Sequence, residues 1–334
     1  MRKRLSGLAF WLAAALATVG LAGTAAAQDK MFAEARAAAE AYDVDKAVSL
    51  YTEAIDSGRL SPLELMLAYM GRGDARESYV EAFGIDDAKM LLAFRDYREA
   101  RQILPTATGF LREGGTLIAL GAYNEASTQY RSARALEQPS PHWSLISLAR
   151  VERIQERYDA ALQYLDEALR LESGGTMPIY YHRGRTLYLQ GKYADAVESF
   201  TKGFAYQPDY AYAFFFRACA QARAGNPAEA LKDFGKGSEI LDGLSAEPWN
   251  KTPAAESGRQ DRARDLAVIK AMADGGASEE ERAKLCTFTW NDSDKRRTRS
   301  PLLNIDDLQI VQLTSRAAPL VGLNRTCRGA CNVP

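Results

Sequence analysis

The sequence predicts an all-α fold, a solenoid of stacked helix pairs, because it contains an internal repeat. Met177 to Tyr210 and Ala211 to Leu244 carry the same residue types at a spacing of 34 residues. Each copy also divides into two helical stretches on either side of a glycine, Gly191 or Gly225. Such a repeat is typical of stacked units that bury their apolar faces against their neighbours. We therefore expect a protein that presents a long surface rather than an enclosed pocket.

The first residues have the pattern of an export signal. Arg2, Lys3 and Arg4 precede an uncharged run of 23 residues, Leu5 to Ala27, which ends in three alanines. This pattern predicts a secretory signal cleaved after Ala27, so we expect an exported mature chain, which in a bacterium is a periplasmic one. The alternative is an uncleaved anchor in the inner membrane, because a run of this length can span a bilayer.

The charge balance gives no support to functions that need a strongly basic surface. Removal of residues 1–27 lowers the count of Lys and Arg from 42 by three to 39, against 43 Asp and Glu, so the mature chain has a formal charge of about −4. Nucleic-acid binding usually depends on a basic face. We expect no nucleic-acid partner and no electrostatic attachment to an anionic membrane.

The clearest copy of the repeat shows why each residue type is needed. Ile179 to Gln190 is predicted to form its first helix and Ala194 to Tyr206 its second. Gly184 and Ala196 are small where two helices cross closely, and Phe200 fills the space beside them. A large residue at Ala196 would overpack this crossing.

The pattern of this copy resembles that of the tetratricopeptide repeat family, in which small residues, aromatic residues and a proline occupy fixed positions. The residues that fit in order are Tyr180, Gly184, Leu187, Ala196, Phe200, Gly203 and Pro208. The connector Ser57 to Pro62, followed by Leu-Ala-Tyr, is also similar to those of exported bacterial members. The resemblance implies a right-handed superhelical solenoid of about six helix-turn-helix units, with a C-terminal capping helix and an irregular tail.

Extended along the chain, the pattern predicts six repeats. They cover residues 28–61, 62–106, 107–141, 142–176, 177–210 and 211–244. The second is longer, because Gly73 and Ala93 are 20 residues apart where the pattern has 12. The additional residues, around Glu77 to Asp86, form either an extended helix pair or a surface loop.

The last part of the chain, residues 245–334, departs from the repeat. Ser245 to Arg259 contains two prolines and a glycine and is predicted to be a linker or irregular segment. Arg262 to Ala273 has apolar residues at helical spacing, which favours a helix that caps the last repeat. Ser278 to Leu285 is predicted to continue as a helix, while Leu302 to Leu323 fits a short helix or a strand.

The cysteines predict a covalent link within this tail. Cys286, Cys327 and Cys331 lie in the tail, whereas Cys219 lies alone in the sixth repeat. Thiols of exported chains tend to be oxidised, so we expect a disulfide between Cys286 and either Cys327 or Cys331. A disulfide between Cys327 and Cys331 is an alternative. A zinc site made of the three tail thiols and a further ligand is another.

No motif in the sequence predicts catalysis, a cofactor or a small-molecule substrate. His142 and His182 have no nucleophile or carboxylate partner nearby in the sequence, and their expected role is structural. There is no glycine-rich phosphate loop and no nucleophile elbow. We therefore expect a protein that is not an enzyme.

The family resemblance implies a concave peptide-binding groove lined by the first helix of each repeat. The residues at these positions are Trp143, Ile146, Arg150, Arg153, Tyr181, Arg185, Tyr188, Tyr212, Phe215 and Arg223. Aromatic side chains with arginines suit a protein or peptide ligand that carries carboxylates. The alternative is that many of these aromatics pack between repeats or under the capping tail.

The expected function is thus a non-catalytic scaffold or adaptor of the cell envelope. Two other functions stay open. Residues 245–334 could form a metal-binding or enzymatic module that the repeats direct to its target, or the solenoid could self-assemble into a homo-oligomer through an imperfectly capped end.

Overall fold

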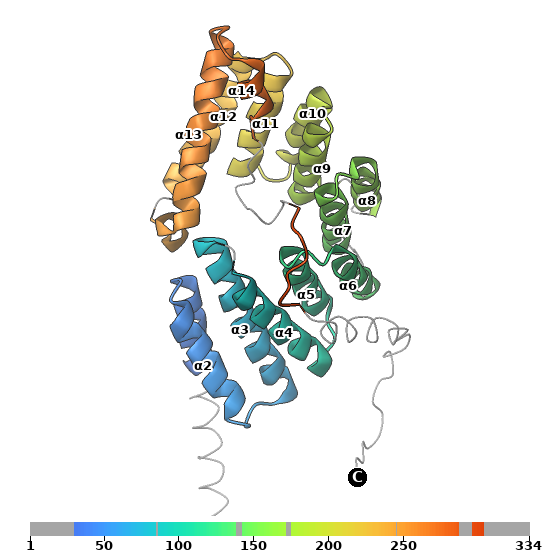
Figure 1. The fold of residues 1–334 in the computed structure, drawn as a ribbon, viewed down its shortest axis with the longest axis vertical. Helices are drawn as coiled ribbons and strands as arrows, with labels where there is room; N and C mark the ends of the chain where they lie inside the picture. Colours follow the sequence, from blue (N-terminus) through green and yellow to red (C-terminus); the bar gives the residue numbers. More distant parts are fainter. Residues whose placement is uncertain are drawn as a thin grey trace, which may run out of the picture. The chain divides into compact units, whose positions relative to one another are not determined.

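The computed structural model describes residues 30–84, 86–137, 142–171, 175–244, 246–286 and 296–303 (Figure 1). Over these residues the chain is helical and contains no strand, so the predicted all-α class is confirmed. The predicted signal 1–27, the segment 304–334, and with it Cys327 and Cys331, lie outside the described residues. Among the described helices, none combines the length and apolar character needed to cross a membrane.

Consecutive helices contact each other as pairs, as the repeat pattern predicts. Residues 30–40 are helical and precede α2. The helices that follow are α2 (Val44–Asp56), α3 (Pro62–Phe83), α4 (Asp87–Ile103), α5 (Ala107–Ala119), α6 (Tyr123–Leu136), α7 (His142–Ile154), α8 (Tyr158–Leu171), α9 (Met177–Leu189), α10 (Tyr193–Gly203), α11 (Ala211–Arg223) and α12 (Pro227–Gly243). Helices α3, α5, α7, α9 and α11 thus begin at the first residues of repeats two to six in the sequence pattern.

Short polar residues at the ends of the connectors explain where several of these helices begin. Before α3, the N–H of Ser61 donates to the Glu64 carboxylate at 2.7 Å, while the Ser61 hydroxyl faces the Glu64 N–H at 3.4 Å. Thr106 accepts a hydrogen bond from the N–H of Gly109 at 3.1 Å at the start of α5. These caps satisfy backbone donors that have no partner in the first turn of a helix.

The described residues belong to two compact units. The first unit contains residues up to 105 together with 246–257, and the second contains 106–245 together with the residues from 258 onward. In the first unit, α3 packs along α4. In the second unit, four helix pairs, α5 to α12, form most of the structure.

In the first unit, the additional residues of the second repeat lengthen a helix. Helix α3 has 22 residues and α4 has 17, so the extended helix pair, rather than a surface loop, accommodates them. Arg72 and Arg76 of α3 both bind the carboxylate of Asp96 on α4, and Arg72 does so at 2.8 Å. These contacts hold the two long helices together at a buried position.

In the second unit, the first helices of the pairs form one layer. Helix α5 contacts α7, α7 contacts α9, and α9 contacts α11. The second helices α6, α8 and α10 each contact the first helix of the next pair. The layer of first helices is therefore the part of this unit that could carry a continuous binding surface.

The packing at the helix crossings agrees with the reason given for the small residues. A Cβ atom added at Gly184 would lie 2.6 Å from the ring of Phe200, which is fully buried. Gly191, between α9 and α10, has φ +80°, a conformation that favours glycine. The same contact recurs in another pair, where a Cβ at Gly114 would meet the ring of Tyr130 at 2.5 Å.

The C-terminal segment is more helical than the sequence pattern predicted. The expected linker, residues 245–259, contains the short 3-10 helix η1 (Pro248–Lys251) and the start of α13 (Pro253–Ala273). Its prolines occupy the first turns of these helices, where the missing N–H costs little. The short helix α14 (Glu279–Ala283) follows, with a capping box between Ser278 and Glu281.

Candidate peptide-binding surface

The ten residues predicted to line the groove fall into three groups by exposure. The exposed fraction of Trp143 is 49%, the highest of the ten. Four side chains are half-buried: Arg150, Arg185, Tyr212 and Arg223. Five are buried: Ile146, Arg153, Tyr181, Tyr188 and Phe215. The accessible part of the predicted surface therefore consists of Trp143 and the four half-buried side chains.

Packing between repeats explains most of the buried group. Ile146 belongs to a core cluster with Leu145 of its own helix, Leu165 of α8 and Ile179 of α9. The guanidinium of Arg153 lies 3.3 Å from Nδ1 of His182 on the next first helix. These side chains stabilise the contact between helix pairs, so a peptide cannot reach them without disturbing the stack.

Around Arg185, aromatic rings and a guanidinium form a layered cluster. The Arg185 guanidinium lies 4.8 Å above the ring of Phe216 and 5.5 Å above that of Tyr181. Tyr181 in turn packs edge-on against Tyr210, with ring centroids 5.2 Å apart. Such stacking is a cation–π contact between a guanidinium and aromatic faces. This half-buried arginine is held in one place by its own repeat and by the next.

The C-terminal segment of the chain covers the predicted positions on α11. Phe215, Cys219 and Ala222 of α11 share a core cluster with Ile269 of α13 and with Leu285. Phe215 is fully buried, and the Arg262 guanidinium lies 5.7 Å above its ring. The surface predicted for the sixth repeat is therefore occupied by the chain itself.

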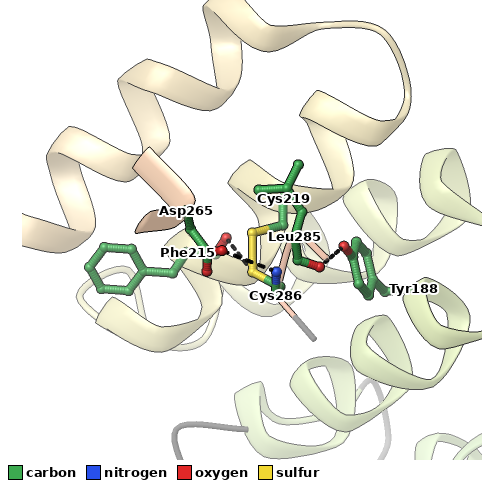
Figure 2. Close-up of a disulfide and its surroundings, with 6 residues drawn as sticks. All are labelled: Tyr188, Phe215, Cys219, Asp265, Leu285 and Cys286. Carbon is green, nitrogen blue, oxygen red and sulfur yellow. Dashed lines mark hydrogen bonds between the residues drawn. A yellow bond between two sulfur atoms is a disulfide. The ribbon is translucent and has the colours of Figure 1, made fainter. Parts of the chain in front are cut away.

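Tyr188 ties this covering segment to the fifth repeat. Its hydroxyl donates to the backbone carbonyl of Leu285 at 2.5 Å (Figure 2). Burial of this hydroxyl raises the pKa of Tyr188 above its usual range. Arg223 contacts the same region, because it donates to the Tyr193 hydroxyl at 2.7 Å and lies 3.9 Å from the Glu279 carboxylate. Tyr188 and Arg223 thus act within the protein as supports of its C-terminal segment.

The disulfide differs from the predicted pairing. Cys286 pairs with Cys219, with an S–S distance of 2.02 Å and a separation of 67 residues (Figure 2). The predicted partners Cys327 and Cys331 lie outside the described residues, and the expected bond from Cys286 to either of them is corrected by this finding. Residue 286 lies against α11 because α13 and α14 fold back onto the last repeat, which the spacing of cysteines could not indicate.

Asp265 of α13 lies beside the disulfide and was not singled out by its sequence context. Its side chain is 1% exposed, and one carboxylate oxygen faces the N–H of Cys286 at 3.4 Å (Figure 2). Burial raises the pKa of Asp265 to about 7, against a smaller opposing effect of the Cys286 N–H and of Arg264. A buried carboxyl group of this kind is a signal that only the structure provides.

A short segment near the end of the described chain contacts the connection between α5 and α6. The N–H of Ser300 donates to the carbonyl of Leu120 at 2.8 Å, and the N–H of Arg297 donates to the Tyr123 hydroxyl at 2.6 Å. Arg299 pairs with Glu125 of α6 at 2.5 Å. We call residues 296–303 the C-terminal strap. Its arginine side chains bind the backbone carbonyl of Ala119 and the carboxylate of Glu125 in the third repeat.

These observations define a helical-repeat protein whose first helices present arginines and aromatics, partly covered by its own C-terminal segment. Residues 111–176 and 181–243 match the family model of the tetratricopeptide repeat. The match identifies tetratricopeptide repeats in these two segments of the second unit. A comparison with curated proteins finds no match.

The chain is also similar to several solved structures. PilW, a type IV pilus biogenesis factor, matches with a TM-score of 0.50 and 19% identity, over 67% of this chain and 97% of that chain. A tetratricopeptide repeat protein from Parabacteroides merdae matches with a TM-score of 0.48 and 15% identity, over 77% of this chain and 96% of that chain. At 19% identity the likeness to PilW concerns the fold alone.

Proposed function

We propose that this chain is a non-catalytic scaffold of the bacterial cell envelope that binds an acidic, extended segment of a protein partner on the first helices of its second unit. The periplasmic location is supported by the predicted export signal in residues 1–27 and by the disulfide, which is typical of an oxidising compartment. The fold supports the interaction role, because tetratricopeptide repeat proteins are protein-interaction scaffolds.

The stacked guanidinium of Arg185 is the observation that carries the choice of ligand. It rests on Phe216 and Tyr181, and so its position is fixed before a partner arrives. Preorganisation of this kind lowers the entropy lost on binding. Trp143 and Arg150 on the neighbouring helix α7 add an exposed aromatic side chain and a second cation. Arginine with accessible aromatics suits a peptide that carries carboxylates and apolar side chains.

The test compares two sets of arginine variants of the mature chain, residues 28–334. Arg150→Ala with Arg185→Ala removes the two cations of the proposed surface, whereas Arg183→Ala removes a half-buried cation of α9 that pairs with Asp166 of α8 instead. Immobilised wild-type protein captures envelope proteins, and peptides of a captured protein are then titrated in solution. We expect the double variant to lose at least about tenfold in peptide affinity, as two charge-assisted contacts would require.

Two further results are expected if the proposal is right. Binding should weaken as salt is raised, because part of it is electrostatic, and the Arg183→Ala variant should bind as wild type does. Unchanged affinity in the double variant, with an unchanged melting curve, would contradict the proposed surface. Light scattering over a range of concentrations separately tests self-assembly, the other function that the repeat pattern leaves open.

A further inference from the structure

Asp265 is a buried carboxyl group that the disulfide beside it does not require. Its Oδ1 faces the N–H of Cys286 at 3.4 Å, and its Oδ2 is buried without a hydrogen-bond partner. Burial of a carboxylate without full pairing costs stability. A disulfide is uncharged and gains nothing from a neighbouring carboxylate. The disulfide therefore does not explain why Oδ2 of Asp265 is buried beside it.

The position of the carboxylate relative to the two sulfur atoms is informative. One ligand atom from each of Cys219, Asp265 and Cys286 lies within 4.8 Å of the others, and all three residues are buried. Figure 2 shows the Asp265 carboxylate directed toward Cys286 and the disulfide. Zinc binds thiolate sulfur at about 2.3 Å and carboxylate oxygen at about 2.0–2.2 Å in a tetrahedral arrangement. Two ligand atoms of such a site are therefore under about 4 Å apart, which is close to the size of this group.

We propose that, once the disulfide is reduced, Cys219, Cys286 and Asp265 bind one zinc ion. A dithiol reductant supplies two electrons and two protons to the disulfide and itself becomes a disulfide, so Cys219 and Cys286 become thiols. Zinc then displaces the two thiol protons, which pass to solvent. Two thiolates and one carboxylate outweigh the charge of the ion by one negative charge, and water takes the fourth position. The unpartnered Oδ2 becomes a ligand.

The disulfide and the zinc ion would be alternative links between the same two segments. Both join α11, through Cys219, to the residue that follows α14, through Cys286. The C-terminal segment would consequently stay attached to the last repeat in oxidising and in reducing conditions. This site differs from a zinc site built from the tail thiols, because it uses a cysteine of the sixth repeat and an aspartate of α13.

The test uses cobalt and zinc with the mature chain in a Cys327→Ser, Cys331→Ser background, which removes competing thiols. The protein is reduced with a phosphine, the phosphine is removed under argon, and Co²⁺ is added. We expect one Co²⁺ per chain, with the near-ultraviolet charge-transfer absorption of thiolate ligands and the visible bands of a tetrahedral site. The same protein in its oxidised form is the control. It should show neither the charge-transfer absorption nor the bands of a tetrahedral site.

Variants of the third ligand decide whether Asp265 takes part. Asp265→Asn should weaken zinc binding by at least about tenfold, in the range seen when groups of a metal site are removed. Asp261→Asn, which alters an aspartate of the same helix that pairs with Arg264, should leave the affinity unchanged. The proposal is overturned if reduced protein takes up no cobalt, if the bands persist in Cys219→Ser, or if Asp265→Asn binds zinc as tightly as wild type.

Discussion

At single positions, the repeat depends on residues that leave room for a ring from the partner helix. Gly184 lies against Phe200, Gly114 against Tyr130 and Gly73 against Tyr97, each with space for no more than a hydrogen atom. The rings are among the most buried side chains of the described chain. The sequence predicted the contact of Gly184 with Phe200, and the structure confirms it. That contact lies within one repeat, where spacing along the chain determines spacing in the structure.

Replacement of Gly184 by alanine tests this packing directly. A Cβ at this position would come within 2.6 Å of the Phe200 ring, so we expect Gly184→Ala to lower the free energy of unfolding by about 1–3 kcal/mol. The control is Gly235→Ala in α12, where no atom lies within 4 Å of the added Cβ. There the better helix propensity of alanine should stabilise the protein by up to about 1 kcal/mol. Urea unfolding measures both, and equal effects would contradict the argument.

Asp265 predicts a specific dependence of stability on pH in the oxidised protein. Its pKa is about 7 in the folded state, above the value near 3.9 of an unfolded chain. The folded state therefore binds this proton more tightly. The resulting stabilisation is complete below about pH 4 and is lost as the pH rises through 7. The loss is on the order of 3 kcal/mol between about pH 5 and pH 8.

The variant Asp265→Asn should remove this dependence, because an amide does not titrate. Urea unfolding of oxidised wild type and variant, with a chelator present, measures the difference in stability at the two pH values. We expect the variant to gain on wild type as the pH rises, by about 3 kcal/mol. Other titrating groups are common to both proteins and cancel in the comparison. A difference that stays constant with pH would show that this carboxyl group is not perturbed by burial.

Among the elements, helix starts were predictable and the C-terminal helices were only partly so. Small residues, caps and connector prolines mark the start of each pair, and these signals are local. Pro253 was interpreted as a sign of irregular structure, yet it begins α13, because proline is tolerated in the first turn of a helix as well as in a linker. The coverage of Phe215 could not be predicted either, because its cover comes from a helix about fifty residues further along the chain.

The C-terminal strap, residues 296–303, allows a test at the level of an element. Gly121 follows α5 with φ +74°, and a Cβ there would lie 2.5 Å from the backbone oxygen of Thr298. We expect Gly121→Ala to displace the strap from the third repeat. Trypsin cuts after arginine, and the strap contains Arg296, Arg297 and Arg299. Limited proteolysis should therefore release the tail faster from the variant than from wild type.

Gly191→Ala provides the matched control for this experiment. Gly191 occupies the corresponding turn between α9 and α10 with φ +80°, but nothing lies within 4 Å of an added Cβ. Alanine should cost about 1–2 kcal/mol there through backbone strain alone. If both variants release the tail equally fast, general destabilisation rather than loss of the Thr298 contact explains the cleavage.

On the scale of the whole molecule, the disulfide acts within one of the two compact units. Cys219 and Cys286 both belong to the second unit, which contains residues 106–245 and those from 258 onward. The pairing joins residues 67 positions apart, and such a contact depends on how α13 and α14 fold back. The repeat pattern contains no information on that step, because the C-terminal segment is not a copy of the repeat.

Reduction of the disulfide should consequently destabilise one unit and leave the other unchanged. A cross-link across 67 residues contributes about 4 kcal/mol in the chain-entropy model, so the reduced protein, with a chelator present, should lose about that much. Hydrogen exchange followed by mass spectrometry shows which helices lose stability. Amides of α9, α11 and α13 beyond residue 258 should exchange faster after reduction, whereas those of α2, α3 and α4 should keep their rates.

Cys219→Ser should reproduce the pattern without reductant. Faster exchange in α3 and α4 as well would show that the two units unfold together, against the division that the structure indicates.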